Sequence, residues 1–91
     1  MSPKFPRRYL DEQNFLEIAY YKIVADQFRP HGWHYRLAWV QNGNCRVVFD
    51  NHQGKADHYH VDGKEVPYTF SDVDQLITDF MSLIRKLGGP I

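Results

Sequence analysis

The sequence HYHVDGKEVPYTF, residues 58–70, decides the fold because it encodes a hairpin whose register follows from its turn. Polar and apolar residues alternate on both sides of an Asp-Gly pair, which is a preferred two-residue turn between antiparallel strands. This turn places His60 directly opposite Glu65. Opposed residues point to the same face of a sheet, and so do residues two apart along a strand. The sequence therefore predicts that His58, His60 and Glu65 share one face.

The segment before this hairpin predicts two more strands. Residues 34–41 and 45–50 alternate in character and flank the sequence NGN, which is rich in turn-forming residues. A three-residue loop at 42–44 places Val40 opposite Arg46 and makes one face continuously apolar, whereas a two-residue turn would mix both faces. The apolar face then consists of Tyr35, Leu37, Trp39, Cys45, Val47 and Phe49.

The two ends of the chain complete the predicted fold. Residues 14–28 fit both a helix and a strand, and their content of Ile, Val and Tyr favours a strand. Residues 73–87 carry apolar side chains at helical spacing, with Ser71 as the expected N-cap and Gly88 as the stop.

These patterns predict an α+β fold, an antiparallel meander sheet of about four to five strands with one C-terminal amphipathic helix packed on one face. Residues 1–13 contain two prolines and a basic cluster, so we expect an irregular basic arm there. Residues 14–91 are expected to form a single α+β domain, because a chain of 91 residues has no room for a second core.

The composition excludes several classes of protein. A net charge of +0 provides no overall positive field to attract nucleic acid, so any such contact must be a local patch. Cys45 is the only cysteine, which excludes an intrachain disulfide and a cysteine-based zinc site, and its alternating context predicts a buried thiol. The sequence has neither a membrane-spanning apolar run nor a signal peptide, so we expect a cytoplasmic protein with no membrane contact.

The face opposite the predicted helix collects ionisable side chains if Asp50 lies opposite His58. Histidines beside carboxylates give and take protons near neutral pH. Cleavage of RNA without a metal requires one group that takes the 2′-hydroxyl proton and one that protonates the leaving 5′-oxygen. It also requires a cation that stabilises the phosphorane. The predicted catalytic residues are His58 and His60, oriented by Asp50 and Glu65. The predicted phosphate-binding residues are Lys55, Arg46 and Arg36, with Trp33 and His34 as candidates for base stacking.

The residues alone leave other interpretations open. Cross-strand pairs of histidine and carboxylate contribute only about 0.2–1 kcal/mol and need no function. In a metal-dependent hydrolase, His58 and His60 would bind zinc, manganese or iron together with Asp50, and Glu65 could add a further carboxylate. Metal-free acid–base chemistry, by contrast, requires no cofactor. The chain could also act without catalysis by binding a partner, and His31 and His52 are expected to be merely exposed on loops.

Three segments together resemble the small TumE-type toxins of bacterial and archaeal toxin–antitoxin pairs. They are YRLAWV, RVVFDNHQGKADHYHVDGKEVPYTF and SDVDQLITDFMSLI. The shared run is Asp-Asn, Gly-Lys, Asp-His-x-His and Pro-Tyr-x-Phe, followed by an amphipathic helix, and it covers roughly residues 30–86.

The resemblance implies the toxin of a type II toxin–antitoxin pair, which inhibits growth and is encoded beside a DNA-binding, helix-turn-helix antitoxin. RNA cleavage is the activity expected of a toxin of this size, so an enzyme of this kind would be a ribonuclease. The motif matches Asp50, Asn51, Lys55, Asp57, His58 and His60, and this adds Asn51 to the expected substrate-binding residues. An uncovered edge strand would let the sheet pair with the antitoxin or with a second copy as a homodimer.

Overall fold

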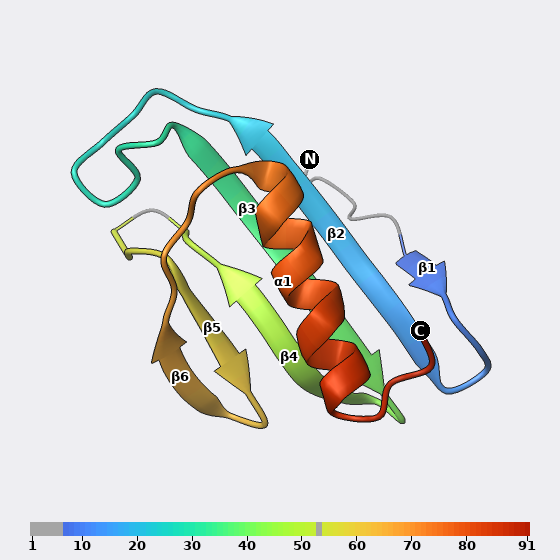
Figure 1. Ribbon diagram of the computed structural model, residues 1–91. Coiled ribbons are helices and arrows are strands. Elements are labelled where there is room, and N and C mark those ends of the chain that lie inside the picture. Colours follow the sequence, from blue (N-terminus) through green and yellow to red (C-terminus); the bar gives the residue numbers. More distant parts are fainter. Residues whose placement is uncertain (1–6, 53) are drawn as a thin grey trace.

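The computed structural model describes residues 7–52 and 54–91 and consists of one antiparallel sheet and one helix (Figure 1). The strands lie side by side in chain order, each antiparallel to the next, so the sheet is the predicted meander. The elements are β1 (Arg7–Tyr9), β2 (Asn14–Lys22), β3 (Trp33–Gln41), β4 (Asn44–Asp50), β5 (His58–Val61), β6 (Lys64–Pro67) and α1 (Val73–Lys86).

The described part of the sheet has six strands rather than the four to five predicted from the sequence. The additional strand is β1, which lies within the segment predicted to be an irregular arm and pairs with β2. Residues 1–6 of that arm lie outside the described residues, so its boundary with the domain stays a prediction. The ambiguous segment after it forms β2, which confirms the strand favoured by its composition.

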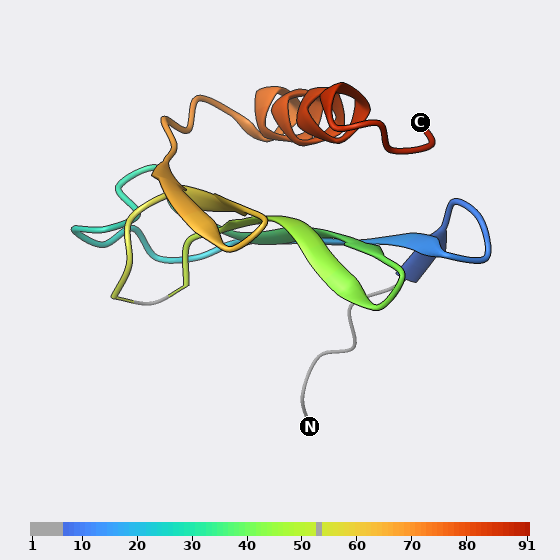
Figure 2. The same ribbon diagram turned by 90° about the horizontal axis from the view of Figure 1, so that it is seen from below.

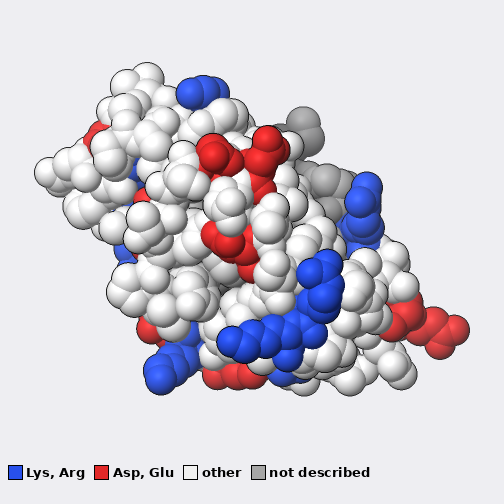
Figure 3. Space-filling model, viewed as in Figure 1, with Lys and Arg blue, Asp and Glu red and all other residues white. Residues whose placement is uncertain are grey.

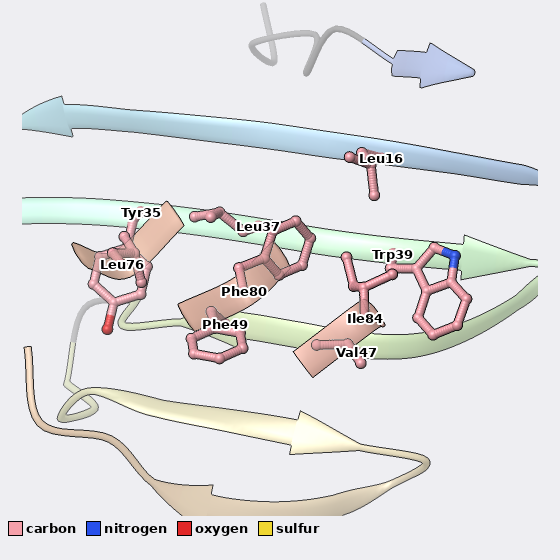
Figure 4. Close-up of a cluster of buried hydrophobic side chains, with 9 residues drawn as sticks. All are labelled: Leu16, Tyr35, Leu37, Trp39, Val47, Phe49, Leu76, Phe80 and Ile84. Atoms are coloured by element: carbon pink, nitrogen blue, oxygen red, sulfur yellow. The ribbon is translucent and has the colours of Figure 1, made fainter. Parts of the chain in front are cut away.

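Helix α1 covers one face of the sheet, and among the described residues no helix lies on the other, open face (Figure 2). Its apolar stripe is buried through Leu76, Phe80 and Ile84, which pack on side chains that alternate along the central strands (Figure 4). Removing this apolar surface from water is the main stabilising contribution, at about 25 cal/mol per Å². The buried sheet residues of this core are Leu16, Tyr35, Leu37, Trp39, Val47 and Phe49.

The two ends of α1 are stabilised by local contacts. The N-cap is Asp72, whose carboxylate accepts a hydrogen bond from the backbone N–H of Gln75, so the prediction of Ser71 was wrong by one residue. Gly88 has a φ of +87° after the last turn, as its predicted role as helix stop requires. Acidic side chains gather toward the start of α1 and basic ones toward its end, an arrangement that favours the helix dipole (Figure 3). This helix is too short and too polar to span a membrane, and no other helix occurs in the described residues.

The first hairpin corrects the predicted loop. Its turn contains only Asn42 and Gly43, both with positive φ, instead of three residues. Arg46 is an extra, unpaired residue in β4, so a β-bulge restores the predicted pairing of Trp39 with Val47 on the apolar face. The bulge also moves Cys45 to the opposite face, where it is exposed rather than buried.

Candidate active site

The face of the sheet away from α1 carries the histidine pair. Strand β4 pairs with β5 so that Asp50 lies opposite His58, and β5 pairs with β6 so that His60 lies opposite Glu65. Both pairings agree with the register predicted from the sequence. Because the two histidines are two residues apart on β5, they project to the same side, and their ring centroids are 5.1 Å apart.

The two imidazoles have different surroundings. His58 is only 5% exposed, so it is not the solvent-facing group that the sequence suggested. Its Nδ1 lies 2.8 Å from the carbonyl oxygen of Ala56. A carbonyl only accepts hydrogen bonds, so Nδ1 of His58 carries the hydrogen and Nε2 of the neutral ring keeps a free lone pair. His60 is more exposed, and its Nε2 lies 3.2 Å from Oε1 of Glu65.

Lys55 and Glu65 form the charged side of this site. The lysine Nζ donates to Oε1 of Glu65 at 2.5 Å, the same oxygen that lies near His60. The hydrogen bond from Lys55 lowers the pKa of Glu65, so its carboxylate is ionised at neutral pH and forms an ion pair with His60 when that ring is protonated. Beside them lies a shallow pocket of about 210 Å³, lined by Lys55, Ala56, Asp57, His58, Glu65 and Pro67.

Two of the other predicted residues lie near the histidine pair but have partners of their own. Asp50 lies opposite His58, but the ion pair it forms is with His52, at 3.4 Å. Arg36 lies opposite Asp50 on this face and approaches Glu17 at 3.9 Å.

The structure separates Arg46 and Asn51 from the histidines. Arg46 is bound to Asp62 at 2.5 Å and to Gln41 at 2.6 Å, and its guanidinium lies over the ring of Trp39. The β-bulge explains this difference, since it turns Arg46 out of the alternating pattern. Asn51 is 0% exposed, so a substrate-binding role does not fit its position.

A partly buried polar network, which the sequence did not predict, is centred on Asp57. Its carboxylate accepts hydrogen bonds from the hydroxyl of Tyr35 at 2.7 Å and from the side-chain amide of Asn51 at 3.0 Å. The third donor is Nε2 of His31, at 3.1 Å from both carboxylate oxygens, because Nδ1 of that ring accepts the backbone N–H of Trp33. His31 is therefore a structural residue and not the merely exposed loop histidine expected from the sequence.

His34 lies on the same face as the histidine pair, and Trp33 does not. The ring of His34 stacks on Tyr21 with 5.0 Å between the ring centroids, and Nδ1 of His34 accepts a hydrogen bond from Arg29 at 3.2 Å. Burial and the positive charge of Arg29 lower the pKa of His34, which keeps the ring neutral. Trp33 points to the face of the sheet that α1 covers, where its ring lies beside Tyr20. Of the two residues predicted to stack on bases, only His34 lies on the face of the histidine pair.

Comparisons with known proteins identify one family. A family model described as Toxin TumE matches residues 6–87, which is most of the chain. No curated protein and no solved structure matches the chain.

Proposed function

The chain belongs to the TumE toxin family, and from this premise we propose that it inhibits growth by cleaving RNA without a metal ion. Membership in a toxin family suggests an antitoxin partner. We further propose a type II pair, in which a small helix-turn-helix protein binds and neutralises the toxin. The observation that carries the proposal is the pair of adjacent imidazoles on the open face of the sheet, one bonded to a backbone carbonyl and the other beside a carboxylate.

The nearest polar partners assign different roles to the two histidines. The carbonyl of Ala56 holds the hydrogen of His58 on Nδ1, so Nε2 is the general base that takes the proton of the 2′-hydroxyl. The carboxylate of Glu65 lies 3.2 Å from Nε2 of His60, so we assign the protonated form of His60 as the general acid. The 2′-oxygen then bonds to phosphorus while the bond to the 5′-oxygen breaks. His60 gives its proton to that leaving oxygen, and the products are a 2′,3′-cyclic phosphate and a 5′-hydroxyl.

Cationic side chains on the same face supply the remaining requirement. Lys55 lies beside the two histidines through its contact with Glu65, and its side chain is 45% exposed, so it can reach a phosphate in solvent. A preorganised cation stabilises charge that develops in the transition state. Arg36 is a further cation on this face, and Asp50 lies between it and His58 in the sheet.

Labelled RNA incubated with the purified protein and EDTA provides the test. Wild type should produce fragments that end in cyclic phosphate, and a strand with one 2′-deoxy position should resist cleavage there. General acid–base groups contribute about 10²–10⁴-fold, so His58→Gln and His60→Gln should each lose at least about 100-fold in rate. His52→Gln is the matched control, because it replaces an exposed histidine of the neighbouring loop and should leave the rate unchanged.

Growth assays in cells complete the test. Induced wild-type protein should arrest growth, and the variants without His58 or His60 should not, although their melting temperatures stay close to that of wild type. Growth arrest by the double variant His58→Gln/His60→Gln would contradict the proposal. It would favour a protein that inhibits by binding a partner without catalysis.

A further inference from the structure

The open face also carries a set of metal-ligand atoms. His58, His60 and Glu65 each offer one atom, and these three atoms lie within 4.8 Å of one another. The first two residues are on β5, and Glu65 lies opposite His60 on β6, so two paired strands hold the set. Asp50, which the sequence grouped with the histidines as a metal ligand, is not in this set, and its carboxylate pairs with His52.

From this geometry we propose that His58, His60 and Glu65 bind a divalent transition-metal ion and that the bound ion switches off the proton-transfer site. Two imidazoles and one carboxylate are a common zinc-binding set and leave a fourth position open. Tetrahedral zinc places neighbouring ligand atoms about 3.3 Å apart, given bonds of about 2.0–2.1 Å. The atoms of His60 and Glu65 are already 3.2 Å apart, and all three ligand atoms lie within 4.8 Å of one another, so small side-chain movements complete the set.

The hydrogen bond of His58 also favours metal binding. Histidines that bind metals usually donate the other ring N–H to a carbonyl or carboxylate, which fixes the tautomer and the direction of the ring. In this protein the carbonyl of Ala56 takes that place, at 2.8 Å from Nδ1. The free Nε2 of His58 is therefore already prepared as a ligand atom.

Lys55 competes with the ion for the same carboxylate. Its ammonium lies 2.5 Å from Oε1 of Glu65, which is the oxygen nearest to His60. A bound dication must displace this ammonium, and the partly exposed side chain of Lys55 can turn into solvent. Replacing Lys55 should consequently strengthen metal binding, although the same change removes a cation proposed to bind RNA.

The switch rests on the proposed function, because an ion bound to both imidazoles occupies the lone pairs that proton transfer requires. The binding site itself does not rest on it. Binding and cleavage therefore need separate measurements.

Zinc is the probe for the binding experiment, with protein that lacks a polyhistidine tag. Competition with a chromophoric chelator should give one ion per chain. His60→Gln and Glu65→Gln should each weaken binding more than about tenfold, since even the loss of an outer hydrogen bond costs about 10–100-fold. Lys55→Met should bind zinc more tightly than wild type. The matched controls are His52→Gln and Glu12→Gln, the latter at an exposed position between β1 and β2, and both should bind zinc as well as wild type does.

Ring signals in histidine NMR spectra provide a second readout of the site. Zinc should shift the signals of His58 and His60 and leave those of His31 in place. Absence of binding would overturn the site, and so would binding that His60→Gln and Glu65→Gln do not weaken.

RNA cleavage with EDTA or with zinc then separates the two proposals. Cleavage in EDTA that zinc suppresses supports both the metal-free function and the switch. Cleavage in EDTA that persists at saturating zinc overturns the switch alone. Cleavage that requires zinc overturns both the metal-free function and the switch. Zinc binding without cleavage under either condition overturns the proposed function, and with it the switch, while the site stands.

Discussion

Replacing Asp57 by alanine removes the carboxylate on which three donors converge inside the protein. Asn51 would keep the hydrogen bond that it donates to the carbonyl of Trp33 at 2.8 Å. The ring of His31 is partly exposed, so its Nε2–H can turn to water. The hydroxyl of Tyr35 has no such substitute, because this residue is 0% exposed and Asp57 is its acceptor.

The cost of the substitution follows from these losses. A buried polar group left without a partner costs about 1–3 kcal/mol, and the lost second hydrogen bond of Asn51 adds about 1 kcal/mol. Burial raises the pKa of Tyr35 and persists without Asp57, so its hydroxyl cannot escape the cost by ionising. The free energy of unfolding should fall by about 2–4 kcal/mol, which lowers Tm by about 10–30 °C in a domain of this size.

Urea denaturation followed by circular dichroism measures this loss directly. Asp50→Ala is the matched control, because that carboxylate pairs with the exposed His52 on the open face and its loss should cost under about 1 kcal/mol. Tyr35→Phe should cost about 1 kcal/mol by itself. In the double variant Asp57→Ala/Tyr35→Phe the hydroxyl without a partner is gone. The double variant should therefore lose less free energy of unfolding than the two single variants lose together. Strictly additive losses, or an Asp57→Ala variant as stable as Asp50→Ala, would refute the network.

Other substitutions test the core, the helix cap and one histidine. Phe80→Ala should cost about 3–5 kcal/mol in urea denaturation, because its ring projects from α1 into the core and is fully buried against the sheet. Asp72→Ala should cost about 1 kcal/mol in the same assay, whereas Ser71→Ala should be neutral. Burial and Arg29 lower the pKa of folded His34, so the unfolded chain binds more protons in mild acid. Stability from this residue is therefore complete above about pH 6.5 and falls as the pH drops below it. When the urea midpoint is measured at a series of pH values, His34→Gln should reduce the fall in stability below about pH 6.5.

Local patterns were enough to predict the open face of the sheet. A two-residue Asp-Gly turn fixes its register within a few residues, and strand alternation then decides the face of each neighbour. His58, His60 and Glu65 follow from those two rules. Positive φ at Asp62 and Gly63 agrees with the turn type on which this prediction rests.

The first hairpin shows where local patterns fail. A β-bulge adds a residue to one strand, and nothing in the sequence from Asn42 to Val47 distinguishes it from a longer loop. Apolar alternation still gave the correct pairing of Trp39 with Val47, because both must face the core. The same alternation predicted the wrong pairing for Arg46, because this polar residue does not have to face the core.

The polar network could not be predicted because its members are far apart in the sequence. His31 and Asp57 are separated by 26 positions and meet only when the loop before β3 folds against the loop before β5. No periodicity links such positions. A histidine, a tyrosine and a carboxylate each have an ordinary reason to be on a surface.

The network and the candidate active site are two sides of one loop. Asp57 and His58 are neighbours, and their side chains diverge, Asp57 to the buried network and His58 to the open face of the sheet. Asn51 and Asp57 bond to each other across the loop, which holds both of its ends. The carbonyl of Ala56, which fixes the tautomer of His58, lies between them. The contacts of Asp57 thus hold in place the backbone carbonyl that fixes the tautomer proposed for His58. A weakened network should therefore change the orientation and the tautomer of the His58 ring, even though neither Tyr35 nor Asn51 lies at the proposed substrate site.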